Sequence, residues 1–165
     1  MNYWLTIPFL TICATIQVAW LPQFPIFGLK PDLALILVVA CGVLAPLSEA
    51  VEWGLYLGIL LDLSSGLPFG IQTISLTLVG ILVSLGQSTF FRGNVIATPI
   101  AMIGATLVYD VLILAFLALF GASIQWNDSL VRVVLPTAVV NAVIMPIIYF
   151  PLHLVQRRKV VDMGL

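Results

Sequence analysis

Charged residues are scarce in this chain of 165 residues. Only 8% of its side chains are charged, against about 25% in an average soluble protein. Hydrophobic residues make up 62% of the chain, and the mean hydropathy is +1.20. This composition excludes a soluble domain and predicts an integral membrane protein with several spans of about 20 residues each.

The shortage of basic residues also excludes nucleic acid as a partner. Lysine and arginine together number 6, and the formal net charge is −1. A nucleic-acid interface needs a basic patch that neutralises phosphates, and no cluster in this chain is large enough.

Histidine and cysteine are too few to build a catalytic or metal site. The single histidine, His153, lies at the end of the last apolar run, where it cannot activate a serine or cysteine deep in lipid. Cys13 and Cys41 lie in separate apolar runs without metal-ligand spacing, which is typical of packing residues. No phosphate-binding loop motif is present. The sequence therefore predicts no catalytic residue, metal or cofactor, and no enzyme.

The apolar runs are long and do not alternate, which favours transmembrane helices over a barrel. The N-terminal run lacks the positive side chains and the small cleavage-site residues of a signal peptide, so we interpret it as a retained first span. The fold class is therefore an all-α integral membrane protein, a single domain over residues 1–165 with about six transmembrane helices. The expected helices cover residues 4–21, 32–47, 51–65, 71–89, 95–120 and 129–154.

The third expected helix is short, at about 22 Å against a hydrocarbon core of about 30 Å. It either tilts little, lies inside the bundle or enters the membrane only partly. Six helices put both termini on one side. That side holds Arg92, Arg157, Arg158 and Lys159, while the other side holds Lys30 and Arg132. The positive-inside rule then places both termini in the cytoplasm.

The segment from Gly54 to Gly70 combines glycines with a buried acid. Gly54, Gly58 and Asp62 follow one another at intervals of four and share one helix face. Such a face suits close contact with another helix, from a partner or from the chain itself. Gly66, Pro68 and Gly70 mark the turn that ends this helix.

Three acids lie in or at the start of the expected helices. Asp62 either binds local backbone groups or Ser64 and Ser65 and shapes the turn, or it pairs with Arg132 on a neighbouring helix. Asp110, the deepest acid, is either protonated or paired across helices. We group Asp62, Asp110 and Arg132 as a candidate buried charge network. Asp32, after Pro31, is expected to cap its helix.

Two stretches of this sequence resemble the signature of a bacterial family. They are Lys30-Pro31-Asp32-Leu33 and the run Gly58-Ile-Leu-Leu-Asp62-Leu-Ser-Ser-Gly66-Leu-Pro68-Phe-Gly70. The chain resembles the rod-shape-determining MreD family over nearly its whole length, although the second half matches mainly by hydropathy.

The resemblance implies a non-catalytic inner-membrane scaffold of the cell-elongation complex. It implies a fold similar to the S component of energy-coupling-factor transporters. It also implies direct binding of MreC and, through MreC, a link to MreB and the peptidoglycan synthases. Self-association stays open. The residues expected to bind partners or shape the fold are Pro31, Asp32, Gly54, Gly58, Asp62, Gly66, Pro68 and Gly70.

Two other functions fit the composition. A solute-binding subunit of a vitamin transporter would need a polar pocket near the outer surface, and the outer loops offer few polar residues for one. An ion or proton conductor would use Asp62 and Asp110, although a relay needs more acids aligned in depth.

Overall fold

The computed structural model describes residues 3–23, 31–87 and 97–162. Lys30 and Arg92, which entered the expected orientation, lie outside this range, and so do the side chains of Arg157, Arg158 and Lys159. The described residues form helices and no strand. The elements are α1 (Tyr3–Ala19), the 3-10 turn η1 (Leu21–Gln23), α2 (Leu33–Leu44), α3 (Leu47–Ser64), α4 (Ile71–Gly86), α5 (Ala97–Leu119), α6 (Trp126–Ser129), the π-helical η3 (Leu130–Val134) and α7 (Leu135–Asp162).

Elements α6, η3 and α7 follow one another without a break, so the described chain contains six long helical segments. Within the described ranges, two helices are long and apolar enough to cross a membrane, Thr98–Leu119 and Trp126–His153. Three shorter apolar helices accompany them in the described residues, Thr6–Ala19, Leu33–Leu44 and Ile71–Gly86.

The border between α2 and α3 lies earlier in the chain than the sequence suggested. We expected a helix over residues 32–47, but α2 ends at Leu44 and α3 begins at Leu47. The cause is Pro46, because a proline disfavours the helical conformation of the residue before it, and Ala45 is extended with φ −117° and ψ 164°. The polar stretch with Glu49 and Glu52 therefore lies inside α3, which is longer than expected at 18 residues.

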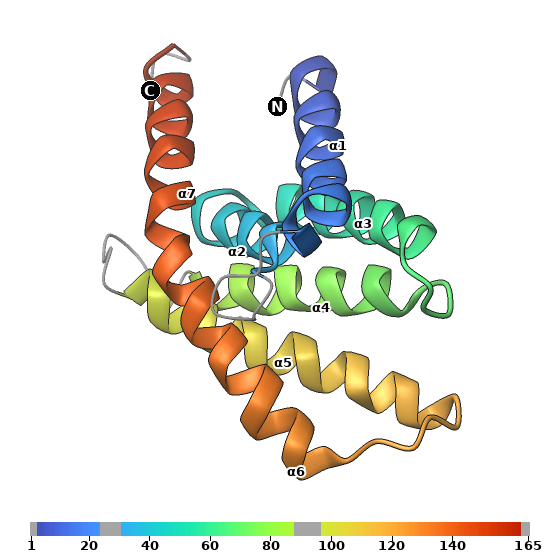
Figure 1. Cartoon of the computed structure of the whole chain (residues 1–165). Coiled ribbons are helices and arrows are strands. Elements are labelled where there is room, and N and C mark those ends of the chain that lie inside the picture. Colours follow the sequence, from blue (N-terminus) through green and yellow to red (C-terminus); the bar gives the residue numbers. More distant parts are fainter. Residues whose placement is uncertain (1–2, 24–30, 88–96, 163–165) are drawn as a thin grey trace.

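Helices α3, α4 and α5 lie side by side, each antiparallel to the next (Figure 1). Helix α7 packs on α5 and α2, and the start of α1 and the end of α7 project from the same side of the molecule (Figure 1). Helix α2 forms the centre: every residue from Ala34 to Val43 is buried. A helix that is apolar on all sides belongs inside a bundle.

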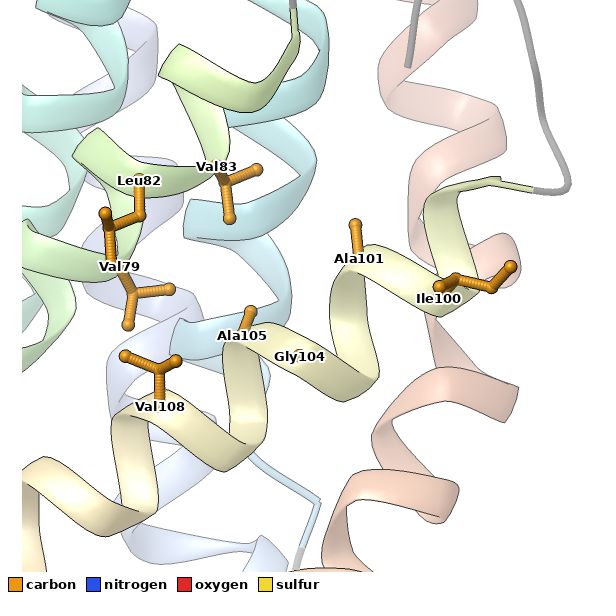
Figure 2. A pocket seen from close by; sticks show the side chains of 8 residues that line it. All are labelled: Val79, Leu82, Val83, Ile100, Ala101, Gly104, Ala105 and Val108. Carbon is orange, nitrogen blue, oxygen red and sulfur yellow. The ribbon is translucent and has the colours of Figure 1, made fainter. Parts of the chain in front are cut away.

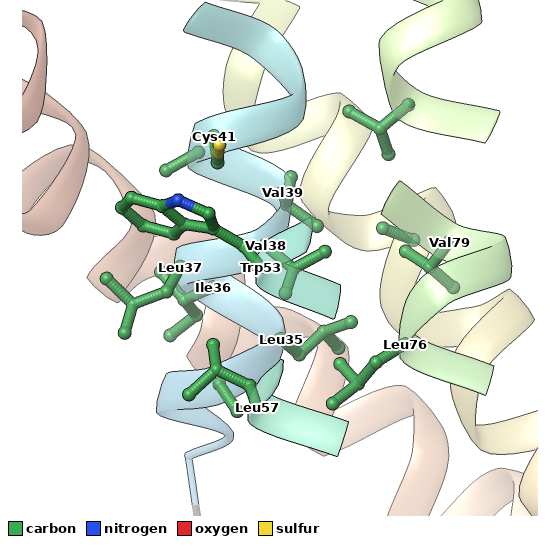
Figure 3. Packing of buried hydrophobic residues seen from close by; sticks show 14 of the residues in the cluster. Leu35, Ile36, Leu37, Val38, Val39, Cys41, Trp53, Leu57, Leu76 and Val79 are labelled. Carbon is green, nitrogen blue, oxygen red and sulfur yellow. The ribbon is translucent and has the colours of Figure 1, made fainter. Parts of the chain in front are cut away.

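Figure 3 shows how this central helix is enclosed. Side chains of α2 pack between Trp53 and Leu57 of α3 on one side and Leu76 and Val79 of α4 on the other. The core thus places α3 and α4 around α2, and α5 and α7 add Met102, Tyr109 and Met145.

The closest helix contact is between α3 and α4, and glycine makes it possible. A Cβ atom on Gly54 would lie 2.9 Å from the Cα atom of Thr77, and one on Gly58 would collide with the Cα atom of Thr73. From the other helix, a Cβ atom on Gly80 would lie 3.0 Å from the carbonyl oxygen of Ala50. The glycine face expected from the sequence is therefore filled by the chain's own α4.

This contact predicts the effect of a single methyl group. Gly58→Ala should lower the free energy of unfolding by about 1–3 kcal/mol, because the added Cβ meets backbone that cannot rotate away. Thermal unfolding of the purified protein in detergent measures the loss. Gly66→Ala is the matched control, since a Cβ there meets nothing within 4 Å. Equal melting temperatures for both variants would contradict the tight contact.

Candidate functional site

Asp62 lies near the end of α3, and its carboxylate binds the start of α4. The first backbone N–H groups of a helix have no partner within the helix, and a carboxylate suits the positive end of the helix dipole. Gly70, the N-cap residue of α4, has a left-handed φ of 101° and no side chain that could accept those bonds. The acid of the preceding helix therefore takes the place of a capping side chain.

Four hydrogen bonds make this cap. Oδ2 of Asp62 accepts from the backbone N–H of Gly70 at 3.0 Å, from that of Thr73 at 3.0 Å and from the Thr73 hydroxyl at 2.5 Å. Oδ1 accepts from the backbone N–H of Gln72 at 3.0 Å. The side chain is only 4% exposed, so both oxygens obtain their partners from the protein. We call this arrangement the Asp62 cap.

Of the two interpretations of Asp62, the backbone one matches these contacts. Its partners are not Ser64 and Ser65: the Ser64 hydroxyl donates to the carbonyl oxygen of Leu60 instead. Arg132, the expected ionic partner, pairs with Asp128 one helical turn away, with 3.4 Å between Nε and Oδ1. That pair is on the surface, with side chains 78% and 57% exposed. The structure thus does not assemble the expected charge network of Asp62, Asp110 and Arg132.

A second set of polar contacts joins four helices. Asp32 is the N-cap of α2: its Oδ1 accepts from the backbone N–H of Leu35 and from Nε2 of Gln17, both at 2.9 Å. Gln17, on α1, accepts in turn from the backbone N–H of Ala34 at 2.6 Å. Asn141 of α7 accepts from the backbone N–H of Asp32 at 3.0 Å and donates to the Thr106 hydroxyl of α5 at 3.3 Å. We call these side chains the four-helix polar cluster: Gln17, Asp32, Thr106 and Asn141.

Sequence reasoning missed three members of this cluster. Gln17, Thr106 and Asn141 each stand as single polar residues inside apolar runs. Asn141 and Thr106 are completely buried. The available signal was the amide itself, because an Asn or Gln in a transmembrane run needs a partner across the helix interface.

Asp110 differs from the other two acids. Its Oδ2 atom is buried and has no hydrogen-bond partner in the described part of the chain. The residue as a whole is partly exposed, on a helix long enough to span the membrane.

Two surface grooves are apolar. The first, of about 300 Å³, lies between α4 and α5, and Figure 2 shows its lining of Val79, Leu82, Val83, Ile100, Ala101, Gly104, Ala105 and Val108. The second, of about 320 Å³, lies between the start of α4 and the end of α5; its lining is Phe69, Gly70, Ile71, Ile74, Phe116, Leu119 and Phe120. No charged side chain lines either groove.

The remaining expected site residues lie in the segments that border helices α2, α3 and α4. Pro31 is buried beside Asp32, and Pro68 is half-buried in the turn between α3 and α4, where Gly66 is exposed. No group of three His, Cys, Asp or Glu residues that could hold a metal ion occurs in the described residues.

These features define a helical bundle of membrane-protein composition, in which two acids cap the starts of helices α2 and α4. A family model for the rod shape-determining protein MreD matches residues 1–159. The chain therefore belongs to the MreD family, a family of membrane proteins involved in determining rod shape. No curated protein and no solved structure matched the chain, so the expected similarity in fold to S components stays a prediction.

The Asp62 cap predicts that replacing one carboxylate oxygen of Asp62 by an NH₂ group destabilises the protein. Asp62→Asn should lower the free energy of unfolding by about 1–3 kcal/mol, because an amide accepts through one oxygen and turns an NH₂ group toward donors. Arg132→Ala should cost no more than about 1 kcal/mol, as is usual for exposed ion pairs. Thermal unfolding of both single variants and the double variant tests this. Non-additive losses would mean that the two residues interact after all.

The four-helix polar cluster gives a separate prediction. Asn141→Leu should cost about 1–3 kcal/mol of unfolding free energy, since it leaves the partly buried N–H group of Asp32 without its acceptor. The control is Asn127→Ala on α6, where the side chain is exposed. A melting temperature of Asn141→Leu at or above that of the control would refute the structural role of Asn141.

Proposed function

We propose that this protein is a non-catalytic scaffold of the bacterial cell-elongation complex, held in the cytoplasmic membrane, where it binds MreC directly. The observation that carries the proposal is the match of residues 1–159 to the MreD family. Through MreC the protein would reach MreB and the peptidoglycan synthases, and its contribution to cell shape would be to position these partners.

The use of the polar side chains supports a scaffold. The carboxylate oxygens of Asp62 and Asp32 accept hydrogen bonds from helix ends and from neighbouring helices. Side chains committed in this way stiffen the bundle and leave little for acid–base chemistry. A stiff bundle offers fixed helix faces to a partner, which is what a positioning subunit needs.

The surface grooves support the same proposal over a vitamin-binding subunit. Both grooves are lined by aliphatic, aromatic and glycine residues. A site for a polar vitamin would need several converging hydrogen-bonding groups. An apolar transmembrane helix or a lipid chain is a better match to this chemistry.

The orientation belongs to the proposal too. The start of α1 and the end of α7 project from the same side of the molecule (Figure 1), as expected for an even number of spans. With the basic tail after His153 on that side, both termini would lie in the cytoplasm.

Co-purification with MreC tests the proposed function. The tagged protein, expressed with full-length MreC and extracted in a mild detergent, should retain MreC through size-exclusion chromatography. A panel of vitamins should leave its melting temperature unchanged, because a ligand stabilises only a protein that binds it. Submicromolar binding of a vitamin together with no retention of MreC would overturn the proposal in favour of a transport subunit.

A further inference from the structure

Asp110 has a carboxylate oxygen inside the bundle that no donor of the described chain binds. This atom, Oδ2, is buried without a hydrogen-bond partner, and the other atoms of that kind among the described residues belong to the hydroxyl groups of Ser65, Ser75 and Thr98. A hydroxyl group carries its own proton and can donate it to a carbonyl oxygen one turn earlier on a helix. An ionised carboxylate has no proton, so Asp110 needs either a donor or a proton of its own.

The donors of the four-helix polar cluster bind other acceptors. The hydroxyl group of Thr106, one turn earlier on α5, donates to a backbone carbonyl oxygen of its own helix. The amide of Asn141 donates to that hydroxyl group, and the amide of Gln17 donates to Asp32. No hydrogen bond joins this cluster to Oδ2 of Asp110.

A second acid lies close enough for its charge to act on Asp110. This acid is Asp32 at the start of α2, a helix that packs against α5. Its Oδ1 accepts from the backbone N–H of Leu35 and from the amide of Gln17, so Asp32 has the donors that Asp110 lacks. Two carboxylates that share a buried region repel each other, and such a pair keeps one proton. The hydrogen bonds assign the ionised form to Asp32 and the proton to Asp110.

The other titratable groups on the helices around α5 supply no positive charge to this carboxyl group. Tyr109 is its neighbour on α5, and Cys41 lies near the other end of α2. Helix α4 contains no titratable residue. Arg132 of η3 is paired on the surface, and the rings of Tyr149 and His153 stack on each other in the later part of α7. Among the described residues, the charge that acts on the carboxyl group is therefore negative.

We propose that Asp110 is the neutral member of an acid pair with Asp32, and that the proton on Asp110 keeps α5 packed against α2. We call these two side chains the Asp32–Asp110 pair. A neutral carboxyl group costs far less to bury than an ionised one, and it does not repel the carboxylate of Asp32. Loss of the proton places two negative charges between α2 and α5, which weakens their contact. The stability of the bundle therefore depends on pH through this pair, whether or not the proposed function holds.

Thermal unfolding of the purified protein over a series of pH values tests the pair. The folded protein holds a proton that the unfolded chain releases, so its melting temperature should fall as the pH rises from about 4, the ordinary range of an aspartate, until the folded carboxyl group also ionises. Asp110→Asn has the shape of the neutral acid and cannot ionise, so it should be at least as stable as the unchanged protein. Within this range the gap between the two melting temperatures should widen by about 3–5 °C for each pH unit.

Two further acids serve as controls. Asp128→Asn, at an exposed acid of α6, should leave the pH dependence of the melting temperature as it is. Asp62→Asn should be less stable than the unchanged protein near neutral pH, because Asp62 has donors for both of its oxygens. The pair thus predicts opposite effects of the same chemical change at residues 62 and 110.

Infrared spectroscopy detects the proton without unfolding the protein. At about pH 6, where an ordinary aspartate is ionised, the unchanged protein should show the C=O stretching band of a neutral carboxylic acid. The band should be absent from Asp110→Asn and from Asp110→Leu, which serves if the first variant does not fold.

Three results would overturn the Asp32–Asp110 pair. A lower melting temperature of Asp110→Asn throughout the pH series would mean that Asp110 is ionised and bound to a donor. Parallel pH curves for Asp110→Asn and the unchanged protein would mean that folding does not change the proton affinity of Asp110. A neutral-acid band that persists in both variants of Asp110 would assign the proton to another acid.

Discussion

The Asp62 cap is the interaction on which the rest of the bundle depends. In lipid no water satisfies the first N–H groups of a helix, so each helix that begins inside the protein must find acceptors there. For α4 these acceptors come from the end of α3, since Gly70 has no side chain to offer. The four bonds of Asp62 fix where α4 begins and how far it lies from α3. Once the two ends are joined, the two helices must run back along each other.

The glycines follow from that constraint. A helix joined so closely at one end has no room for side chains between the backbones, and Gly54 and Gly58 remove them on α3, as Gly80 does on α4. The tight pair then makes one wall of the core around α2, and the other helices cover the remaining faces of α2. Asp32 repeats the same solution at the start of α2, and its bonds bring in α1 and α7. Polar contacts thus set the positions, and apolar packing fills the space between them.

The sequence predicts the helices well and their partners poorly. Apolar runs and prolines reveal six helical segments, because each span must satisfy its own backbone. The border at Pro46 was misplaced since Glu49 and Glu52 looked like a polar loop, although a proline outweighs two acids in ending a helix. The spacing of Gly54, Gly58 and Asp62 revealed a contact face, but spacing carries no information about which helix fills it. The N–H groups that donate to Asp62 lie eight to eleven residues further on, and only the fold of the hairpin brings them close.

The three acids Asp32, Asp62 and Asp110 differ in what their carboxylate oxygens bind. Asp32 and Asp62 accept bonds from helix ends, so the cost of burying them is offset by the helices they hold. Asp110 lies mid-helix, where backbone N–H groups are already bonded, and Oδ2 finds no donor among the described residues. A fold that satisfies two acids with six hydrogen bonds had the means to satisfy or replace the third. Helix ends therefore explain why Asp32 and Asp62 are kept, and they do not explain Asp110, whose Oδ2 is buried without a partner among the described residues.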